Sequence, residues 1–138
     1  MKDPIQEEII EEFSAFDEWL DKYDYLIELS DSLPAIDPAH RTDDYVIKGC
    51  QSRVWVDAKE EDSKVFYSAD SDAIITKGII ALLIRVMNGR SAQEIVDLDL
   101  YFIDAIGLGE NLSPTRSNGL VAMIKQMKMY ALALTSKA

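Results

Sequence analysis

The fold is decided by residues 54–89, which read VWVDAKEEDSKVFYSADSDAIITKGIIALLIRVMNG. The stretch begins with two runs of β-branched and aromatic residues, 54–56 and 65–67, which are typical of β-strands. The charged residues 57–64 between them are typical of a solvated turn. We therefore predict a β-hairpin whose turn lies near residues 60–63.

The second half of the same stretch predicts a central, buried helix over residues 73–87. One helical face carries Ile75, Ile79, Leu82, Leu83 and Val86, and further isoleucines add apolar surface on the other sides. The run Asp70-Ser71-Asp72 in front of it offers side-chain oxygens that can cap the first turn. The pair Asn88-Gly89 behind it is a common helix end.

Further helices are expected on both sides of this unit. Asp3 and Pro4 form an N-cap and first-turn pair for a short N-terminal helix. A second helix should end before Pro34, and its expected buried face carries Phe16, Leu20, Tyr23 and Ile27. Ser91 and Glu94 form a capping box. A last helix should open at Ser113-Pro114, with apolar residues Leu120, Ile124, Met127, Ala131 and Leu134 at 4-3-4-3 spacing.

Residues 45–47, Tyr-Val-Ile, predict a third short strand that leads into Gly49-Cys50. Three sequential strands between helices indicate an α+β fold with a small antiparallel three-stranded sheet packed against helices. The length of 138 residues suits a single domain that spans residues 1–138.

The composition excludes several classes of function. The net charge of −11 is opposite to the basic footprint of a nucleic-acid-binding protein, and a polybasic membrane-binding segment is absent from the sequence. No run approaches the ~18 consecutive apolar residues of a membrane span, and the first residues lack the pattern of a secretory signal. We expect a cytoplasmic protein without nucleic-acid or membrane partners.

The single cysteine, Cys50, limits the chemistry of the chain. It cannot form an internal disulfide, which agrees with a reducing compartment. Cys50 and the single histidine, His40, cannot by themselves form a closed zinc site, and an iron–sulfur cluster held by one chain usually needs about four thiolates. We therefore expect neither a metal nor a cofactor. From the residues alone, Cys50 is either a small buried hydrophobe or a reactive thiol presented in a tight link.

Four blocks of this sequence resemble the SufE family of sulfur-acceptor proteins. The run IKGCQSRVWV (47–56) is similar to the family's active-site loop. WLDKYDYLIELSDSLP (19–34) and DSDAIITKGIIALL (70–83) resemble its second helix and the segment after its third strand. LSPTRSNGLVAMI (112–124) is similar to its C-terminal signature. The four blocks occur in the family's order.

This resemblance implies a function and a set of site residues. SufE-like proteins bind a pyridoxal-phosphate cysteine desulfurase of the SufS type, accept its persulfide sulfur on a cysteine, stimulate the desulfurase and deliver the sulfur to a SufBCD-type scaffold for iron–sulfur cluster assembly. Such a chain is an accessory protein and not itself an enzyme. The acceptor maps onto Cys50, and its loop maps onto Gly49, Gln51 and Ser52. Charged positions expected near the loop map onto Asp72 and Arg116.

The expected chemistry is attack of a thiolate on sulfur, akin to thiol–disulfide exchange. With an unperturbed pKa of ~8.5, about 3% of Cys50 would be thiolate at pH 7. Arg116 and the N-terminal amides of the last helix are candidate stabilisers of the thiolate, and a surface salt bridge is the alternative role of Arg116.

Two other functions stay open at the level of sequence. The chain could be a regulatory module that activates a desulfurase by contact and has a structural Cys50. A cysteine hydrolase would need a base, for which His40 in a proline-containing loop is the candidate. The sequence does not decide which desulfurase is the partner, what the final sulfur acceptor is, or whether the chain forms a homodimer.

Overall fold

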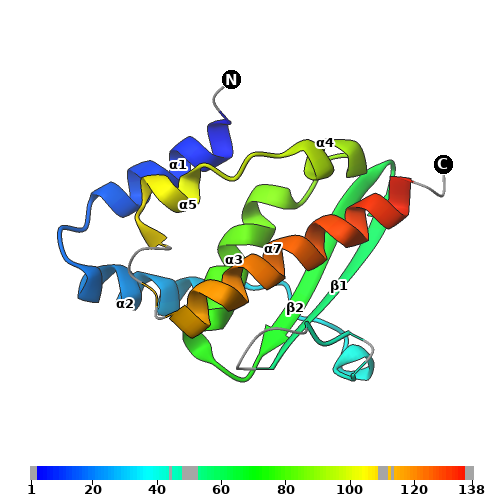
Figure 1. Cartoon of the computed structure of the whole chain (residues 1–138), viewed down its shortest axis with the longest axis horizontal. Coiled ribbons are helices and arrows are strands. Elements are labelled where there is room, and N and C mark those ends of the chain that lie inside the picture. The colour runs from blue at the N-terminus through cyan, green and yellow to red at the C-terminus, as the bar shows by residue number, and fades with distance from the viewer. Residues whose placement is uncertain (1–2, 44, 48–52, 109–111, 113, 136–138) are drawn as a thin grey trace.

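The structure is a computed structural model that describes residues 3–43, 45–47, 53–108, 112 and 114–135, without the side chains of residues 114–116 and 135. Along the chain the elements are α1 (Pro4–Ser14), α2 (Trp19–Leu29), the 3-10 helices η1 (Ser30–Ser32) and η2 (Pro38–His40), β1 (Val54–Glu61), β2 (Lys64–Ser71), α3 (Ile74–Met87), α4 (Ala92–Asp97), α5 (Phe102–Ala105) and α7 (Pro114–Thr135). Helices α3 and α7 lie against the β1–β2 hairpin, and α1 and α5 pack together at the opposite end from the hairpin turn (Figure 1).

The predicted hairpin is confirmed, but its strands are longer than the apolar runs indicated. The two strands pair antiparallel in register from Val54↔Ser71 to Glu61↔Lys64. Asp62 and Ser63 form the turn with positive φ values of 52° and 65°, the backbone of a two-residue turn that matches strand twist. The charged residues 57–61 therefore belong to β1 and not to the turn.

The prediction of a three-stranded sheet is wrong for the described residues, where the sheet has two strands. Residues 45–47 contact β1 through one isolated bridge, Val46↔Trp55, instead of a continuous ladder. The paired segment is too short to form a regular strand: it contributes one hydrogen bond from the N–H of Ile47 and one to the carbonyl of Tyr45.

Helix α3 is the centre of the core, as the sequence predicted. Its residues 79–84, together with Val86 and Met87, are nearly or fully inaccessible to solvent. Its N-cap is Ala73, whose N–H donates to Ser71 Oγ (3.2 Å); neither Asp70 nor Asp72 caps the helix. Among the described residues, no helix is both long enough and apolar enough to cross a membrane.

Helix α7 covers the inner face of the hairpin. The Tyr67 hydroxyl donates to the carbonyl of Met127 (2.7 Å), and the Tyr130 hydroxyl donates to that of Val56 (3.0 Å). Burial raises the pKa of Tyr67, so its hydroxyl stays protonated and remains a donor. The predicted apolar face of α7 is largely confirmed, with Leu120, Met127 and Ala131 buried and Ile124 and Leu134 half-buried.

The predicted buried face of α2 is wrong for two of its four residues, whereas Phe16 and Tyr23 are half-buried. Leu20 is 70% exposed and Ile27 is 36% exposed, whereas Leu26 is fully buried. Leu26 lies against Gly78 of α3, where a Cβ would come within 2.1 Å of the Leu26 carbonyl oxygen. At this close backbone approach Leu26 enters the core, and Leu20 and Ile27 stay exposed.

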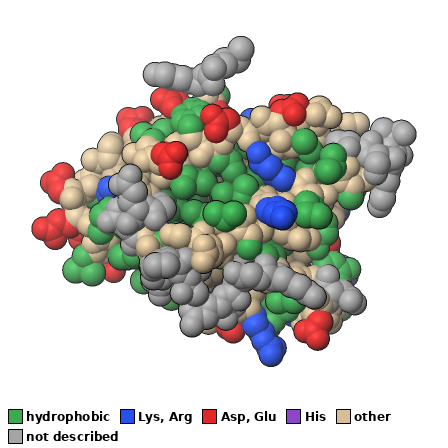
Figure 2. All heavy atoms as spheres, in the orientation of Figure 1, with side chains coloured by type: hydrophobic (Ala, Val, Ile, Leu, Met, Phe, Trp, Pro, Cys, Tyr) green, Lys and Arg blue, Asp and Glu red, His purple; other side chains and the backbone are tan. Residues whose placement is uncertain are grey.

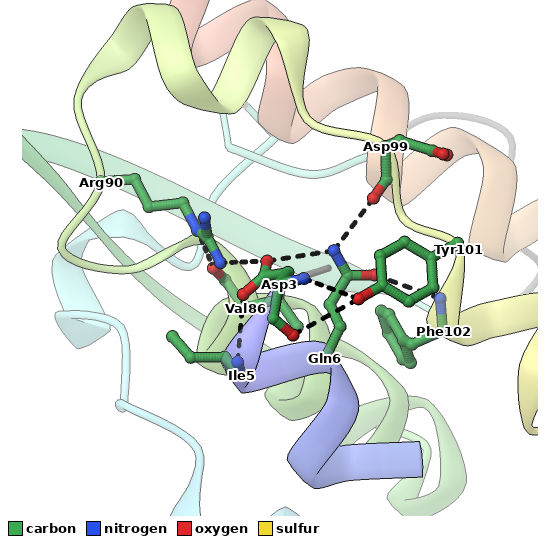
Figure 3. Close-up of polar contacts among 8 residues, drawn as sticks. All are labelled: Asp3, Ile5, Gln6, Val86, Arg90, Asp99, Tyr101 and Phe102. Atoms are coloured by element: carbon green, nitrogen blue, oxygen red, sulfur yellow. Dashed lines mark hydrogen bonds and ion pairs between the residues drawn. The ribbon is translucent and has the colours of Figure 1, made fainter. Parts of the chain in front are cut away.

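A polar cluster joins α1 to the segment before α5 (Figure 3). The amide of Gln6 is fully buried and donates to Asp3 Oδ2 (3.1 Å) and to the carbonyl of Asp99 (2.9 Å), and it accepts from the N–H of Phe102 (3.1 Å). Asp3 also pairs with Arg90. Burial raises the pKa of Asp3, but hydrogen bonds from Gln6 and the backbone and the charge of Arg90 lower it by more. The cluster thus satisfies the hydrogen-bonding groups of the buried Gln6 side chain. Its residues are distant in sequence from residues 48–52, which we call the Cys50 segment.

The acidic excess of the chain is unevenly spread. On the face shown in Figure 2, acidic side chains lie mainly around the left and upper edges, and hydrophobic side chains gather in the middle, between the α1–α5 pair and α7. All 25 acidic residues precede residue 111, whereas the last helix and its flanks carry only basic charges. A partner that approaches α7 therefore meets basic side chains, whereas one that approaches α1 or α2 meets mainly acidic side chains.

Candidate functional site

The four loop residues singled out from the sequence, Gly49, Cys50, Gln51 and Ser52, lie outside the described residues. Their described neighbours in the chain are Ile47 on one side and Arg53 on the other. The geometry of the site is therefore built from these two flanks and from the elements that hold them.

The upstream flank is paired to the start of β1. The N–H of Ile47 donates to the carbonyl of Val54 (2.8 Å), and the N–H of Val56 donates to the carbonyl of Tyr45 (3.1 Å). Ile47 is 4% exposed and belongs to the hydrophobic core. Residues 47 and 54 are thus held side by side, and the Cys50 segment begins and ends at one end of the hairpin.

The downstream flank is held by the end of β2. The Arg53 N–H donates to Asp72 Oδ1 (3.1 Å), and the Arg53 carbonyl accepts from the Ser71 hydroxyl (2.7 Å) and from the N–H of Asp72 (3.3 Å). The family resemblance implied that Asp72 lies near the loop, and Asp72 binds Arg53, the residue directly after Ser52. Ser71 is buried and also accepts from the first N–H before α3, so it couples the flank to the central helix.

A strap, formed by the described residues 34–43 and 45–47, crosses the outer face of the hairpin. It starts along the free edge of β2, where the N–H of Ile36 donates to the carbonyl of Ala69 (3.2 Å), and it ends along β1 at Ile47. Side chains of the strap contact outward-facing residues of both strands between these points. The strap therefore delivers the chain to the Cys50 segment from across the sheet.

Arg41, in the middle of the strap, contacts one residue of each strand. Its guanidinium lies over the Trp55 ring (4.6 Å to the centroid), and its Nε pairs with Asp70 Oδ2 (3.1 Å). Asp70 Oδ1 also pairs with Lys77 Nζ of α3 (3.2 Å). Sequence reasoning missed this cluster, because Asp70 was taken as a helix cap and no local pattern links Arg41 to residues fourteen or more positions away.

These flanks lie in a region with a clear family assignment. A family model described as the SufE Fe-S metabolism associated domain matches residues 7–131. The chain belongs to the SufE family. Its role accordingly lies in iron–sulfur metabolism.

Curated relatives agree with this assignment. An uncharacterised SufE-like protein of Rhizobium meliloti is 38% identical over 130 residues, which cover 91% of this chain and 93% of the relative. A second uncharacterised SufE-like protein, from Rhizobium etli, is 39% identical over 130 residues, 91% of this chain and 88% of the relative. SufE-like protein 1, chloroplastic/mitochondrial, of Arabidopsis thaliana is 38% identical over 135 residues, which cover 97% of this chain but 36% of that longer protein.

A solved structure supports the fold. The solution structure of a hypothetical protein from Thermus thermophilus superposes with a TM-score of 0.80 over 99% of both chains, at 22% sequence identity. At this identity the likeness concerns the SufE-family fold alone.

The structure also describes the positions of Arg116, a charged residue that the family resemblance implied, and His40, the candidate base of the alternative hydrolase function. Arg116 lies in the first turn of α7, and its side chain is outside the description. His40 Nδ1 lies 2.8 Å from Asp57 Oδ2, and the imidazole stacks on Tyr45 at 4.4 Å between centroids. His40 is thus engaged in fastening the strap to β1. Within the described part of the chain, no group of three or more His, Cys, Asp or Glu side chains is arranged to hold a metal ion.

Proposed function

We propose that this SufE-family chain is a sulfur carrier that accepts persulfide sulfur on Cys50 from a PLP-dependent cysteine desulfurase. The observation that carries the proposal is the family assignment over residues 7–131, combined with a single cysteine inside the block GCQS. The described flanks support it, because Ile47 and Arg53 are each held by hydrogen bonds that anchor the Cys50 segment to the hairpin.

The proposed transfer is balanced in atoms and electrons. The Cys50 thiolate attacks the terminal sulfur of the desulfurase persulfide, and a new S–S bond forms as the old one breaks. The desulfurase cysteine leaves as a thiolate, so no external oxidant or reductant is needed. A chain with one thiol cannot discharge its own persulfide by forming an internal disulfide, which suits a carrier.

The test uses the purified chain, a SufS-type desulfurase and free cysteine. Intact-mass spectrometry should show wild type gaining one sulfur atom that a thiol reductant removes, and Cys50→Ser should gain none and should not stimulate the desulfurase. Cys50→Ser preserves side-chain volume, so circular dichroism should match wild type. Full stimulation by Cys50→Ser would refute the carrier role and favour activation by contact.

A role for Arg116 is part of the same proposal. Its place in the first turn of α7 would let a cation and the helix N-terminus favour the thiolate. The pH profile of Cys50 alkylation should move to higher pH in Arg116→Ala, and Arg116→Lys should restore part of the shift because it keeps the charge but not the planar fork. An unchanged midpoint in Arg116→Ala would rule out this electrostatic role.

The proposal extends to partners and location. We infer a cytoplasmic protein that passes sulfur from the desulfurase to a SufBCD-type scaffold, and a homodimer is compatible with this role. Gel filtration with light scattering decides the oligomeric state. Transfer of isotope-labelled sulfane sulfur from the persulfide-loaded chain to a purified scaffold tests the acceptor.

A further inference from the structure

The outer face of the hairpin carries a row of three aligned residues beside the Cys50 segment. Trp55 of β1 is paired with Asp70 of β2 on one side and with Val46 of the strap on the other. Trp55 is 7% exposed although it faces away from the core that contains its neighbour Val54. Something on the outer face must therefore cover the indole.

Arg41 provides part of that cover. Its guanidinium lies over the ring of Trp55 and pairs with Asp70, so one side chain bridges two residues that are directly opposite each other on neighbouring strands. A planar guanidinium can stack on an aromatic face while its N–H groups bind a carboxylate, which lysine cannot do equally well. The bridge therefore limits the orientations that the Trp55 indole can adopt, and it places a positive charge over the ring.

The position of the bridge links it to the Cys50 segment. Trp55 follows Val54, which accepts the hydrogen bond of Ile47 at the start of the segment. Asp70 precedes Ser71, which binds the carbonyl of Arg53 at the end of the segment. The residues that Arg41 bridges are thus each one position away from the residues that hold the two flanks.

We propose that Arg41 is a positioning residue for sulfur transfer: by bridging Trp55 and Asp70, it holds the strand pair from which the Cys50 segment leaves and to which it returns. This inference rests on the proposed function of Cys50 as the sulfur acceptor. In this proposal Arg41 acts through Trp55, which its guanidinium covers, and is not assigned a chemical step of its own.

The chain offers a matched control in Lys77. Lys77 pairs with the same carboxylate of Asp70, at 3.2 Å compared with 3.1 Å for Arg41, but it extends from α3. Its side chain is 36% exposed and that of Arg41 is 44% exposed, so the two ion pairs are similarly screened. Arg41→Gln and Lys77→Gln therefore remove the same charge and the same kind of ion pair, and only Arg41→Gln removes the cover of Trp55.

The first measurement is the rate of Cys50 alkylation in the isolated protein as a function of pH. Arg41→Gln should raise the plateau rate about tenfold without moving the midpoint, a change equivalent to about 1.4 kcal/mol in positioning. Lys77→Gln should match wild type, and Arg41→Lys should fall between wild type and Arg41→Gln. Equal profiles for Arg41→Gln and Lys77→Gln, or a shifted midpoint with an unchanged plateau, would overturn the proposal.

The second measurement is single-turnover persulfide transfer from the desulfurase, which should slow about tenfold in Arg41→Gln and stay at the wild-type rate in Lys77→Gln. If Arg41 acts through Trp55, adding Arg41→Gln to Trp55→Leu should cause no further change in either rate. Additive effects would overturn the proposal, and thermal unfolding of each variant confirms that folded proteins are compared. The alkylation measurement needs no desulfurase. A wild type that takes up no sulfur would thus refute the carrier function, whereas the alkylation profiles report on positioning separately.

Discussion

Replacing Gly78 by alanine should destabilise the protein, although helix propensity alone predicts the opposite. Gly78 is in the interior of α3, where alanine is favoured over glycine by about 1 kcal/mol. A Cβ at this position would lie 2.1 Å from the carbonyl oxygen of Leu26 and 2.7 Å from its carbonyl carbon. A normal carbon–oxygen contact is about 3.3 Å or more, so α2 would have to move by about 1 Å.

The magnitude follows from what has to move. Overpacking a core costs about 1–3 kcal/mol, and the upper end applies here because the obstacle is backbone and cannot rotate away. Subtracting the propensity gain of about 1 kcal/mol leaves a net loss of about 2 kcal/mol. For 138 residues, an unfolding entropy of about 2.1 cal/mol/K per residue converts this loss to a fall in Tm of about 7 °C.

Urea unfolding followed by circular dichroism measures the change, with Lys125→Ala at an exposed position in α7 as the control for propensity. The control should stay within about 0.5 kcal/mol of wild type. A Gly78→Ala variant as stable as wild type, or more stable, would show that the α2–α3 approach does not limit the side chain at this position.

Two further predictions concern the hydrogen bond between Arg53 and Asp72 and the ion pair between Glu12 and Arg85. Asp72→Ala removes the acceptor for the Arg53 N–H, which should cost about 1 kcal/mol and speed alkylation of the single cysteine. Asp72→Asn keeps an acceptor oxygen and should have a smaller effect; equal effects of the two substitutions would contradict the role of Asp72 as the acceptor for the Arg53 N–H. Hydrogen bonds from Arg85 hold the pKa of Glu12 below its ordinary value of 4.5, so the pair's stabilisation is present above that pH and is lost as pH falls through the lowered pKa. Glu12→Gln should therefore lower Tm at pH 7 and converge with wild type in acid, whereas the exposed Glu11→Gln should track wild type throughout; a Tm gap for Glu12→Gln that is constant with pH would refute this account.

Local signals in the sequence determined a large part of the architecture. The turn at Asp62 and Ser63, the capping box of Ser91 and Glu94, and the N-cap Asp3 all depend on neighbours within a few positions, and all are present in the structure. The central position of α3 also follows from the sequence alone, because a helix that is apolar on every side can only be stable when it is surrounded.

The proposal of Cys50 as the acceptor also came from the sequence, through the family resemblance and not through composition or periodicity. The block GCQS around Cys50 and three further blocks identified the SufE family, and the family model over residues 7–131 agrees. Asp72 was flagged in the same way. Its contact with the Arg53 N–H could not be deduced from the sequence, because it depends on how the end of β2 meets the start of β1.

Only the tertiary structure decided which surfaces meet. The apolar spacing of α2 predicted Leu20 and Ile27 on the buried face, whereas in the structure Leu26 is buried, where α2 approaches Gly78 of α3 closely. Arg41 joins residues from both strands across the outer face of the sheet, a contact that no local pattern encodes. The physical reason is the same in both cases: periodicity and capping describe the energy of a segment with itself, whereas burial and long-range pairing depend on the element packed against it.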